Sequence, residues 1–177
     1  MNVSGADAST PEYLAVFANG RNGAQPTVKI AHLIEVAERC GYAVLVPDFS
    51  FSNDPRARIA HLLQLQPRAS QSLVLIGASM GAYVSAMCCA ALQPRALFLM
   101  APALYLPDWD EEPEGIPAMT TVVHGWRDDI VPAERGQRFA ARHKAALHLL
   151  DSGHRLHDQL PMLGLLLDEF LQRARVD

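Results

Sequence analysis

Six short apolar segments, spaced along the whole chain, constrain the fold more than any other feature of the sequence. They are residues 13–18, 42–46, 72–76, 96–100, 120–124 and 146–150. Most are nearly continuous apolar runs, a pattern typical of strands that are covered on both faces of a sheet. Amphipathic segments with helical spacing lie between them. This alternation predicts βαβ units with right-handed crossovers and a parallel sheet.

The segments between the strands predict five helices. They are expected from Pro26 to Gly41, over 55–65, over 79–92, from near Pro132, and after Asp158, a candidate N-cap. Residues 101–118 hold four prolines and little helical periodicity, so an irregular crossover is expected there. We predict an α/β fold, a three-layer α/β/α sandwich with about six strands. It should form one domain over 1–177, with 1–11 as a loose tail.

Charge and cysteine content narrow the function classes. The chain has 177 residues, a net charge of −4 and no block of Lys and Arg, so nucleic acid is not an expected partner. Cys40, Cys88 and Cys89 lack metal-ligand spacing and suggest reduced core thiols. We see no signal peptide and no membrane span, and expect a cytoplasmic protein. No metal or organic cofactor is implied, and the sequence leaves a homo-oligomer open.

The segment Gly-Ala-Ser-Met-Gly at 77–81 joins the third expected strand to a helix. A tight turn at this junction would raise the Ser79 hydroxyl above the sheet edge and strain its backbone. Glycines at 77 and 81 would avoid collisions with the adjacent strand and helix. Ser79 would also open the helix, so the N–H of Met80 could bind an oxyanion. The simpler interpretation is a strand-to-helix turn with Ser79 as an N-cap.

The stretch SLVLIGASMG resembles the nucleophile elbow of the α/β-hydrolase fold. In that family an acid and then a histidine follow the serine, on loops after later strands. The histidine acts as the base that activates the serine, and the carboxylate orients the histidine. The resemblance extends over about residues 13–172 and implies a minimal version of this fold without a cap domain.

The resemblance assigns the base and the acid to two later loops. Gly153-His154, after the sixth strand, resembles the family's Gly-His step, with His157 as the alternative base. The stretch from His124 to Pro132 resembles the family pattern that places the acid at Asp128. Its neighbour Asp129 stays open as an alternative, and Asp151 is a weaker candidate. Asp128 could otherwise simply cap the following helix.

The resemblance also implies a second oxyanion donor in the loop after the first strand. Asn19-Gly20 occupies the place where the family usually has His-Gly. Because the donor is a backbone group, the role passes to the N–H of Arg21, with Asn22 as the alternative. The other interpretation is a glycine-rich turn that leads into the next helix.

Residues 101–118 are too few for a helical lid, so a shallow, open site is expected. Asn22, Phe51, Tyr105 and Trp126 are candidate pocket residues near its rim. The crossover also carries five acidic residues between 108 and 114. These are expected to be solvated. If they lay beside the pocket, they would disfavour anionic substrates.

The combined pattern predicts a serine hydrolase of small carboxylic esters or thioesters. Ser79, Asp128 and His154 would form the catalytic triad, with a covalent acyl-enzyme and a small-molecule acyl substrate. A serine peptidase or amidase, or a catalytically silent binding protein of the same fold, are the alternatives. A nucleotide-binding module is disfavoured, because Gly-Arg-Asn-Gly at 20–23 matches neither the dinucleotide-binding motif GxGxxG nor a P-loop.

Overall fold

The computed structural model describes residues 10–21 and 26–175, so most of the tail predicted at 1–11 lies outside the described residues. Six parallel strands form one sheet in the order β2-β1-β3-β4-β5-β6. Their bounds are β1 Tyr13–Ala18, β2 Ala43–Leu45, β3 Ser72–Ala78, β4 Ala96–Met100, β5 Met119–Gly125 and β6 Ala146–Leu150. The predicted parallel sheet is confirmed, and three strands have the expected bounds.

The helices are α1 Val28–Arg39, α2 Pro55–Leu65, α3 Met80–Met87, α4 Cys89–Leu92, α5 Ala133–His143 and α6 Leu160–Ala174. The single helix predicted over 79–92 is interrupted at Cys88, whose backbone nevertheless keeps right-handed helical angles. A short 3-10 helix, η1 His157–Gln159, precedes α6, so Asp158 is not its N-cap. The carboxylate of Asp158 instead accepts a hydrogen bond from the Ser152 hydroxyl.

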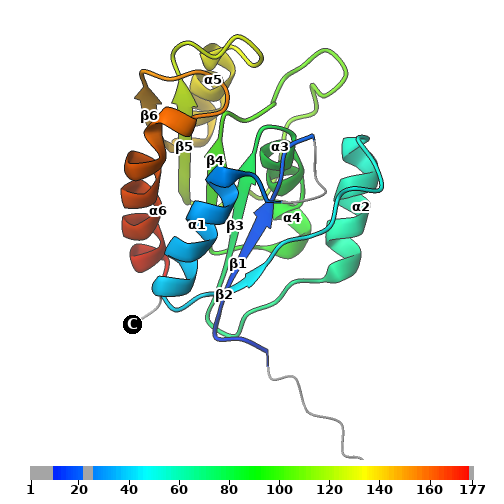
Figure 1. Cartoon of the computed structure of the whole chain (residues 1–177). Coiled ribbons are helices and arrows are strands. Elements are labelled where there is room, and N and C mark those ends of the chain that lie inside the picture. The colour runs from blue at the N-terminus through cyan, green and yellow to red at the C-terminus, as the bar shows by residue number, and fades with distance from the viewer. Residues whose placement is uncertain (1–9, 22–25, 176–177) are drawn as a thin grey trace, which may run out of the picture.

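Helices cover both faces of the sheet and make the three layers that the sequence predicts (Figure 1). On one face, α1 and α6 pack against alternate strand residues such as Phe17 and Phe98. On the other face, α2 to α5 pack against the intervening residues, among them Val16 and Leu97. Because both faces are covered, β1, β3 and β4 are buried along their whole length. This explains why these strands read as continuous apolar runs.

The connection from β4 to β5 is irregular, as predicted. Residues 101–118 contain no helix and only one isolated bridge, between Leu106 and Trp109. Glu112 fastens this crossover to α5: its carboxylate accepts hydrogen bonds from Tyr105 Oη at 3.0 Å and Arg142 Nε at 2.9 Å. His143 Nε2 lies 2.9 Å from the same oxygen. The crossover is therefore a fixed edge of the fold, with no cap over the sheet.

The three cysteines are free and buried, as expected for core thiols. Burial raises the pKa of Cys88 to about 12, so this thiol stays protonated at neutral pH. Across residues 10–21 and 26–175, no helix combines the length and the apolar character that crossing a bilayer requires.

Candidate active site

Two glycines allow the tight turn at the end of β3. A Cβ on Gly77 would lie 2.5 Å from Ala82 Cα in α3, and one on Gly81 would lie 2.0 Å from the carbonyl oxygen of Ala18 in β1. Both distances are far below van der Waals contact. A side chain at Gly77 or Gly81 would therefore collide with a neighbouring helix or strand, as the sequence predicted. This explains why both positions are glycine.

Ser79 occupies a strained conformation in this turn, with φ 55° and ψ −119°. Its amide donates to the carbonyl of Met100 at 2.9 Å, and its carbonyl accepts from the amide of Ala103 at 3.2 Å. These bonds to β4 and the crossover hold the turn in place. Met80 is the first residue of α3, so its N–H has no acceptor within the helix and lies at the positive end of the helix dipole.

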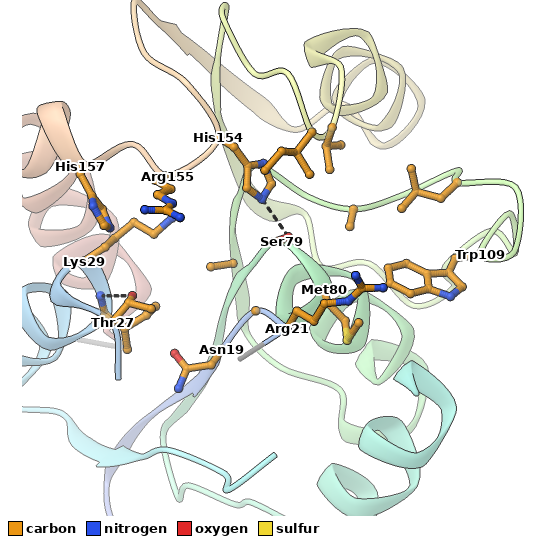
Figure 2. A pocket seen from close by; sticks show the side chains of 17 residues that line it. Asn19, Arg21, Thr27, Lys29, Ser79, Met80, Trp109, His154, Arg155 and His157 are labelled. Carbon is orange, nitrogen blue, oxygen red and sulfur yellow. Dashed lines mark hydrogen bonds between the residues drawn. The ribbon is translucent and has the colours of Figure 1, made fainter. Parts of the chain in front are cut away.

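A chain of hydrogen bonds connects Ser79, His154 and Asp128, which come from three different loops. Ser79 Oγ lies 3.0 Å from His154 Nε2, and His154 Nδ1 lies 2.8 Å from Asp128 Oδ2 (Figure 2 shows the first contact). Because a carboxylate only accepts, Nδ1 carries the ring hydrogen and Nε2 is free to accept the serine proton. Asp129 is exposed and has no hydrogen bond to His154.

Asp128 is held in its charged form by its surroundings. Burial alone would raise its pKa, but hydrogen bonds from His124, His154 and the N–H groups of Val131 and Ile130 outweigh burial and hold that pKa well below its usual range. The two N–H groups lie 2.8 and 3.0 Å from Oδ1. Oδ2 is left for the imidazoles. Asp128 therefore turns the loop after β5 and also fixes His154, while Pro132 stands at the N-cap of α5.

His124 is a contact of the acid that the sequence did not single out. Its fully buried ring places Nε2 3.0 Å from Asp128 Oδ2 and 2.9 Å from the carbonyl of Val131. Both partners are acceptors, so Nε2 carries the hydrogen. Gly136 in α5 makes room for the ring, because a Cβ there would lie 2.5 Å from His124 Nδ1. The only sign of this contact in the sequence is that His124 precedes Asp128 by four residues.

The loops that carry Asp128 and His154 are tied to each other. The amide of Arg127 donates to the carbonyl of Ser152 at 2.9 Å, and its Nε donates to Asp151 at 2.7 Å. Gly125 allows this close approach, because a Cβ there would lie 2.3 Å from the Ser152 carbonyl oxygen. Asp151 thus pairs with Arg127 on the surface and does not reach His154.

Arg58 of α2 fixes the loop after β1. Its fully buried guanidinium donates to the carbonyls of Gly20 and Arg21, each at 2.7 Å, while Nε donates to the carbonyl of Ser52 at 2.7 Å. Asn19 precedes this loop, and both polar atoms of its buried amide lack a hydrogen-bond partner in the part of the chain described. By binding the carbonyls, Arg58 limits how the peptide groups of this loop can rotate.

A cavity of about 560 Å³ opens over Ser79 (Figure 2). Residues of six segments line it, at the carboxyl ends of β1 and β3, at the start of α1, in the crossover, and in the loops after β5 and β6. The lining consists of Asn19, Gly20, Arg21, Thr27, Lys29, Ile30, Ala78, Ser79, Met80, Ala103, Leu106, Trp109, Ile130, Val131, His154, Arg155 and His157. This is the edge at which parallel α/β sheets bind ligands.

Comparison with known proteins places this chain in a family. A scan of protein-family models and a search of curated proteins found no match. Among solved structures, a protein from Xanthomonas campestris pv. campestris that is assigned to the hydrolases of the α/β superfamily is 30% identical, with a TM-score of 0.82. The similarity covers 91% of this chain and 99% of that chain. The chain belongs to the α/β-hydrolase superfamily.

More distant structures share the fold of this α/β-hydrolase. A serine hydrolase without a lid, also from Xanthomonas campestris, is 23% identical over 97% of this chain and 86% of its own, with a TM-score of 0.73. Est1E from Butyrivibrio proteoclasticus, solved with ferulic acid bound, is 16% identical over 93% and 90%, with a TM-score of 0.77. The predicted fold without a cap is confirmed, and the comparisons support a hydrolase.

The candidate pocket residues lie elsewhere in this hydrolase. Phe51 is 56% exposed and stacks edge-on against His61 of α2, and Trp126 is 59% exposed beyond the end of β5. Tyr105 belongs to the crossover and is buried, with the guanidinium of Arg138 over its ring. None of the three lines the cavity. Asn22 lies outside the described residues, so its predicted role stays a prediction.

The aromatic side chain that lines the cavity is a different residue of the crossover, Trp109. Trp109 lines the cavity and stacks on Tyr83 of α3, with ring centroids 5.6 Å apart. The sequence missed it because an irregular segment has no periodicity that predicts which side chain faces the site. Within residues 10–21 and 26–175, no cluster of three or more His, Cys, Asp or Glu side chains is arranged to hold a metal ion.

Proposed function

We propose that this α/β-hydrolase is a serine hydrolase of small carboxylic esters or thioesters, with Ser79 as nucleophile, His154 as base and Asp128 as the acid that orients it. The observation that carries the proposal is the chain of contacts from Ser79 Oγ to His154 Nε2 at 3.0 Å and from Nδ1 to Asp128 Oδ2 at 2.8 Å. The geometry satisfies the requirement that nucleophile, base and orienting group lie within hydrogen-bond reach of one another.

In the acylation step, Ser79 Oγ attacks the substrate carbonyl carbon while His154 Nε2 takes the hydroxyl proton. The charge of Asp128 stabilises the imidazolium that forms. The tetrahedral oxyanion lies against the free N–H of Met80, and we assign the second donor to the N–H of Arg21. Collapse breaks the bond to the leaving alcohol or thiol, which receives the proton from His154.

Deacylation reverses these roles with water as the nucleophile. His154 takes a proton from water, the hydroxide attacks the acyl carbon, and the bond to Ser79 Oγ breaks. The acid is released and the proton returns to Ser79. The open cavity above Ser79 admits water without a lid movement, which supports hydrolysis as the outcome.

The test is a panel of p-nitrophenyl esters from acetate to octanoate, a thioester series and matched anilides. The wild type should hydrolyse esters or thioesters, and Ser79→Ala should lower kcat by about four orders of magnitude. Ser85→Ala, on the same helix but buried away from the cavity, is the matched control and should retain activity. Anilides cleaved faster than esters would contradict the substrate class, and equal activity of wild type and Ser79→Ala would contradict the mechanism.

A further inference from the structure

The cavity over Ser79 is cationic, although the whole chain is acidic. Its lining contains Arg21, Lys29 and Arg155, together with His154 and His157, and none of the lining residues is Asp or Glu. The chain as a whole carries a net charge of −4. The acidic residues of the crossover do not line the cavity.

Lys29 is the least expected of these cations. It lies in the first turn of α1, where the helix dipole disfavours positive charge, and the residue is only 6% exposed. Burial lowers its pKa to about 8, against the attraction of the Asp128 charge, which raises it. Among the described residues, its ammonium has no hydrogen bond and no ion pair. The attraction of Asp128 compensates only in part for burying this cation, so its cost points to a role in the site.

Two further side chains that can bind an anion stand on the same side of the cavity, the guanidinium of Arg155 and the imidazole of His157. Arg155 and His157 follow His154 in the loop after β6, and neither forms an ion pair within the described part of the chain. Figure 2 shows both side chains beside Lys29, with Trp109 on the opposite side of Ser79. The N-cap Thr27 lines the cavity too, so the first turn of α1 is turned toward this group. Lys29, Arg155 and His157 thus stand together on one side of the cavity, and Arg21 and Trp109 stand on the other.

We propose that Lys29, Arg155 and His157 bind a carboxylate group of the substrate, so that the preferred substrates are esters or thioesters that carry a negative charge. This inference rests on the proposed function, since it names the substrate class of the same site. A carboxylate bound beside Lys29 would give its buried ammonium an ion-pair partner. The guanidinium of Arg155 would donate further hydrogen bonds to the same carboxylate. The ester carbonyl would lie at Ser79, and an apolar portion would lie against Trp109.

Kinetics with paired substrates provide the first test. Mono-p-nitrophenyl glutarate carries the carboxylate on the acyl chain, and 4-carboxyphenyl butyrate carries it on the alcohol; their methyl esters are the neutral partners. The wild type should favour one anionic substrate over its neutral partner by about tenfold or more in kcat/KM, the size of one charge-assisted contact. The favoured pair identifies which side of the ester carries the charge.

Lys29→Met should remove this preference by lowering the ratio about tenfold. The chain has one other lysine, Lys144, which precedes β6 at the opposite edge of the sheet from the cavity. Lys144→Met is therefore the matched control and should keep the wild-type ratio. Equal rates for anionic and neutral partners in the wild type, or an unchanged ratio in Lys29→Met, would overturn the proposal.

A binding measurement separates this inference from the catalytic proposal. In Ser79→Ala protein labelled with ¹³C-lysine, only two lysine side chains give signals, and Lys144→Met assigns them. Monomethyl glutarate should shift the Lys29 signal and raise the pKa of Lys29, while dimethyl glutarate should leave both unchanged. If the monoanion has no effect on Lys29, the anion site is wrong even where esters are hydrolysed. If Lys29 responds but no ester is hydrolysed, the anion site stands and the proposed function fails.

Discussion

Asp128 and Asp129 are adjacent in the sequence, yet their environments are opposite. Asp128 is buried and receives hydrogen bonds from two imidazoles and two backbone amides, whereas Asp129 is exposed. A family pattern could place the acid at this loop, but the choice between the two depends on how the loop turns. The contacts of Asp128 with the amides of Ile130 and Val131 determine that turn.

Asp128→Asn should lower kcat by about three to four orders of magnitude, because an amide cannot hold His154 in the required tautomer or stabilise its positive charge. Asp129→Asn is the matched change one residue away and should stay within about twofold of wild type, as expected for an exposed side chain. Both are measured by ester hydrolysis at neutral pH. Similar losses in the two variants would contradict the assignment of the acid.

Lys29→Met should stabilise the protein at pH 7, because the native state buries an unpaired ammonium. The pKa of Lys29 falls from 10.5 to about 8 on folding, mainly through burial, which corresponds to at most about 3 kcal/mol. Below pH 8 Lys29 is charged in both states and the penalty is complete. Between pH 8 and 10.5 the native state has lost a proton that the unfolded chain keeps, so wild-type stability rises with pH.

Urea unfolding of wild type and Lys29→Met at pH 7 and pH 10 measures this difference. The advantage of the variant should be largest at pH 7 and should shrink at pH 10. Lys144→Met, which changes an exposed lysine, should show neither effect. A Lys29→Met protein that is less stable than wild type at pH 7 would contradict the description of Lys29 as an unpaired buried charge.

At the level of elements, the site depends on close approach between β1, β3 and α3. The nucleophile turn fits only because Gly81 lets α3 lie against the end of β1. Arg58 reaches from α2 to hold the next residues of the same loop. The turn and the loop therefore form one unit, which positions the Met80 and Arg21 amides relative to Ser79.

Gly81→Ala should destabilise the protein by about 3 kcal/mol, since a Cβ there would meet the carbonyl oxygens of Ala18 at 2.0 Å and Asn19 at 2.5 Å. Backbone must move to relieve this overlap, so ester hydrolysis should fall as well. Gly153→Ala is the matched control beside His154, because its Cβ would meet only the Arg127 carbonyl oxygen at 3.7 Å. Thermal unfolding checks both variants, and a Gly81→Ala protein with wild-type stability would contradict the steric explanation.

Arg58→Met should lower kcat about tenfold to hundredfold, because the carbonyls of Gly20 and Arg21 lose their donor and the loop loses its orientation. Arg56→Met, on the same helix, removes an arginine whose side chain is 78% exposed and should have little effect. Circular dichroism shows whether each variant is folded. A folded Arg58→Met enzyme with wild-type kcat would exclude a positioning role for Arg58.

At the level of the whole molecule, the sequence predicted the features that arise from periodicity and local sterics. The order of strands and helices, the irregular crossover and the glycines at 77 and 81 all follow from such local patterns. The loops that bear Ser79, Asp128 and His154 meet because parallel strands end at the same edge of the sheet.

Features that depend on tertiary packing were not predictable in the same way. The wall at Trp109 and the guanidinium contacts of Arg58 join segments that are distant in the chain. Lys29 did leave a signal, because it shares the buried helical face of Leu33 and Val36. The acidic crossover illustrates the limit most clearly: the sequence shows its charge, but only the fold shows that its acidic residues do not line the cavity.

The most direct test of the account is labelling with a fluorophosphonate probe, followed by mass spectrometry of the intact protein and its peptides. The wild type should gain one adduct, located on Ser79, and Ser79→Ala should gain none. The buried cysteines should stay unmodified, since burial keeps their thiols protonated. A folded wild-type protein that takes up no probe, or an adduct on another residue, would contradict Ser79 as the nucleophile.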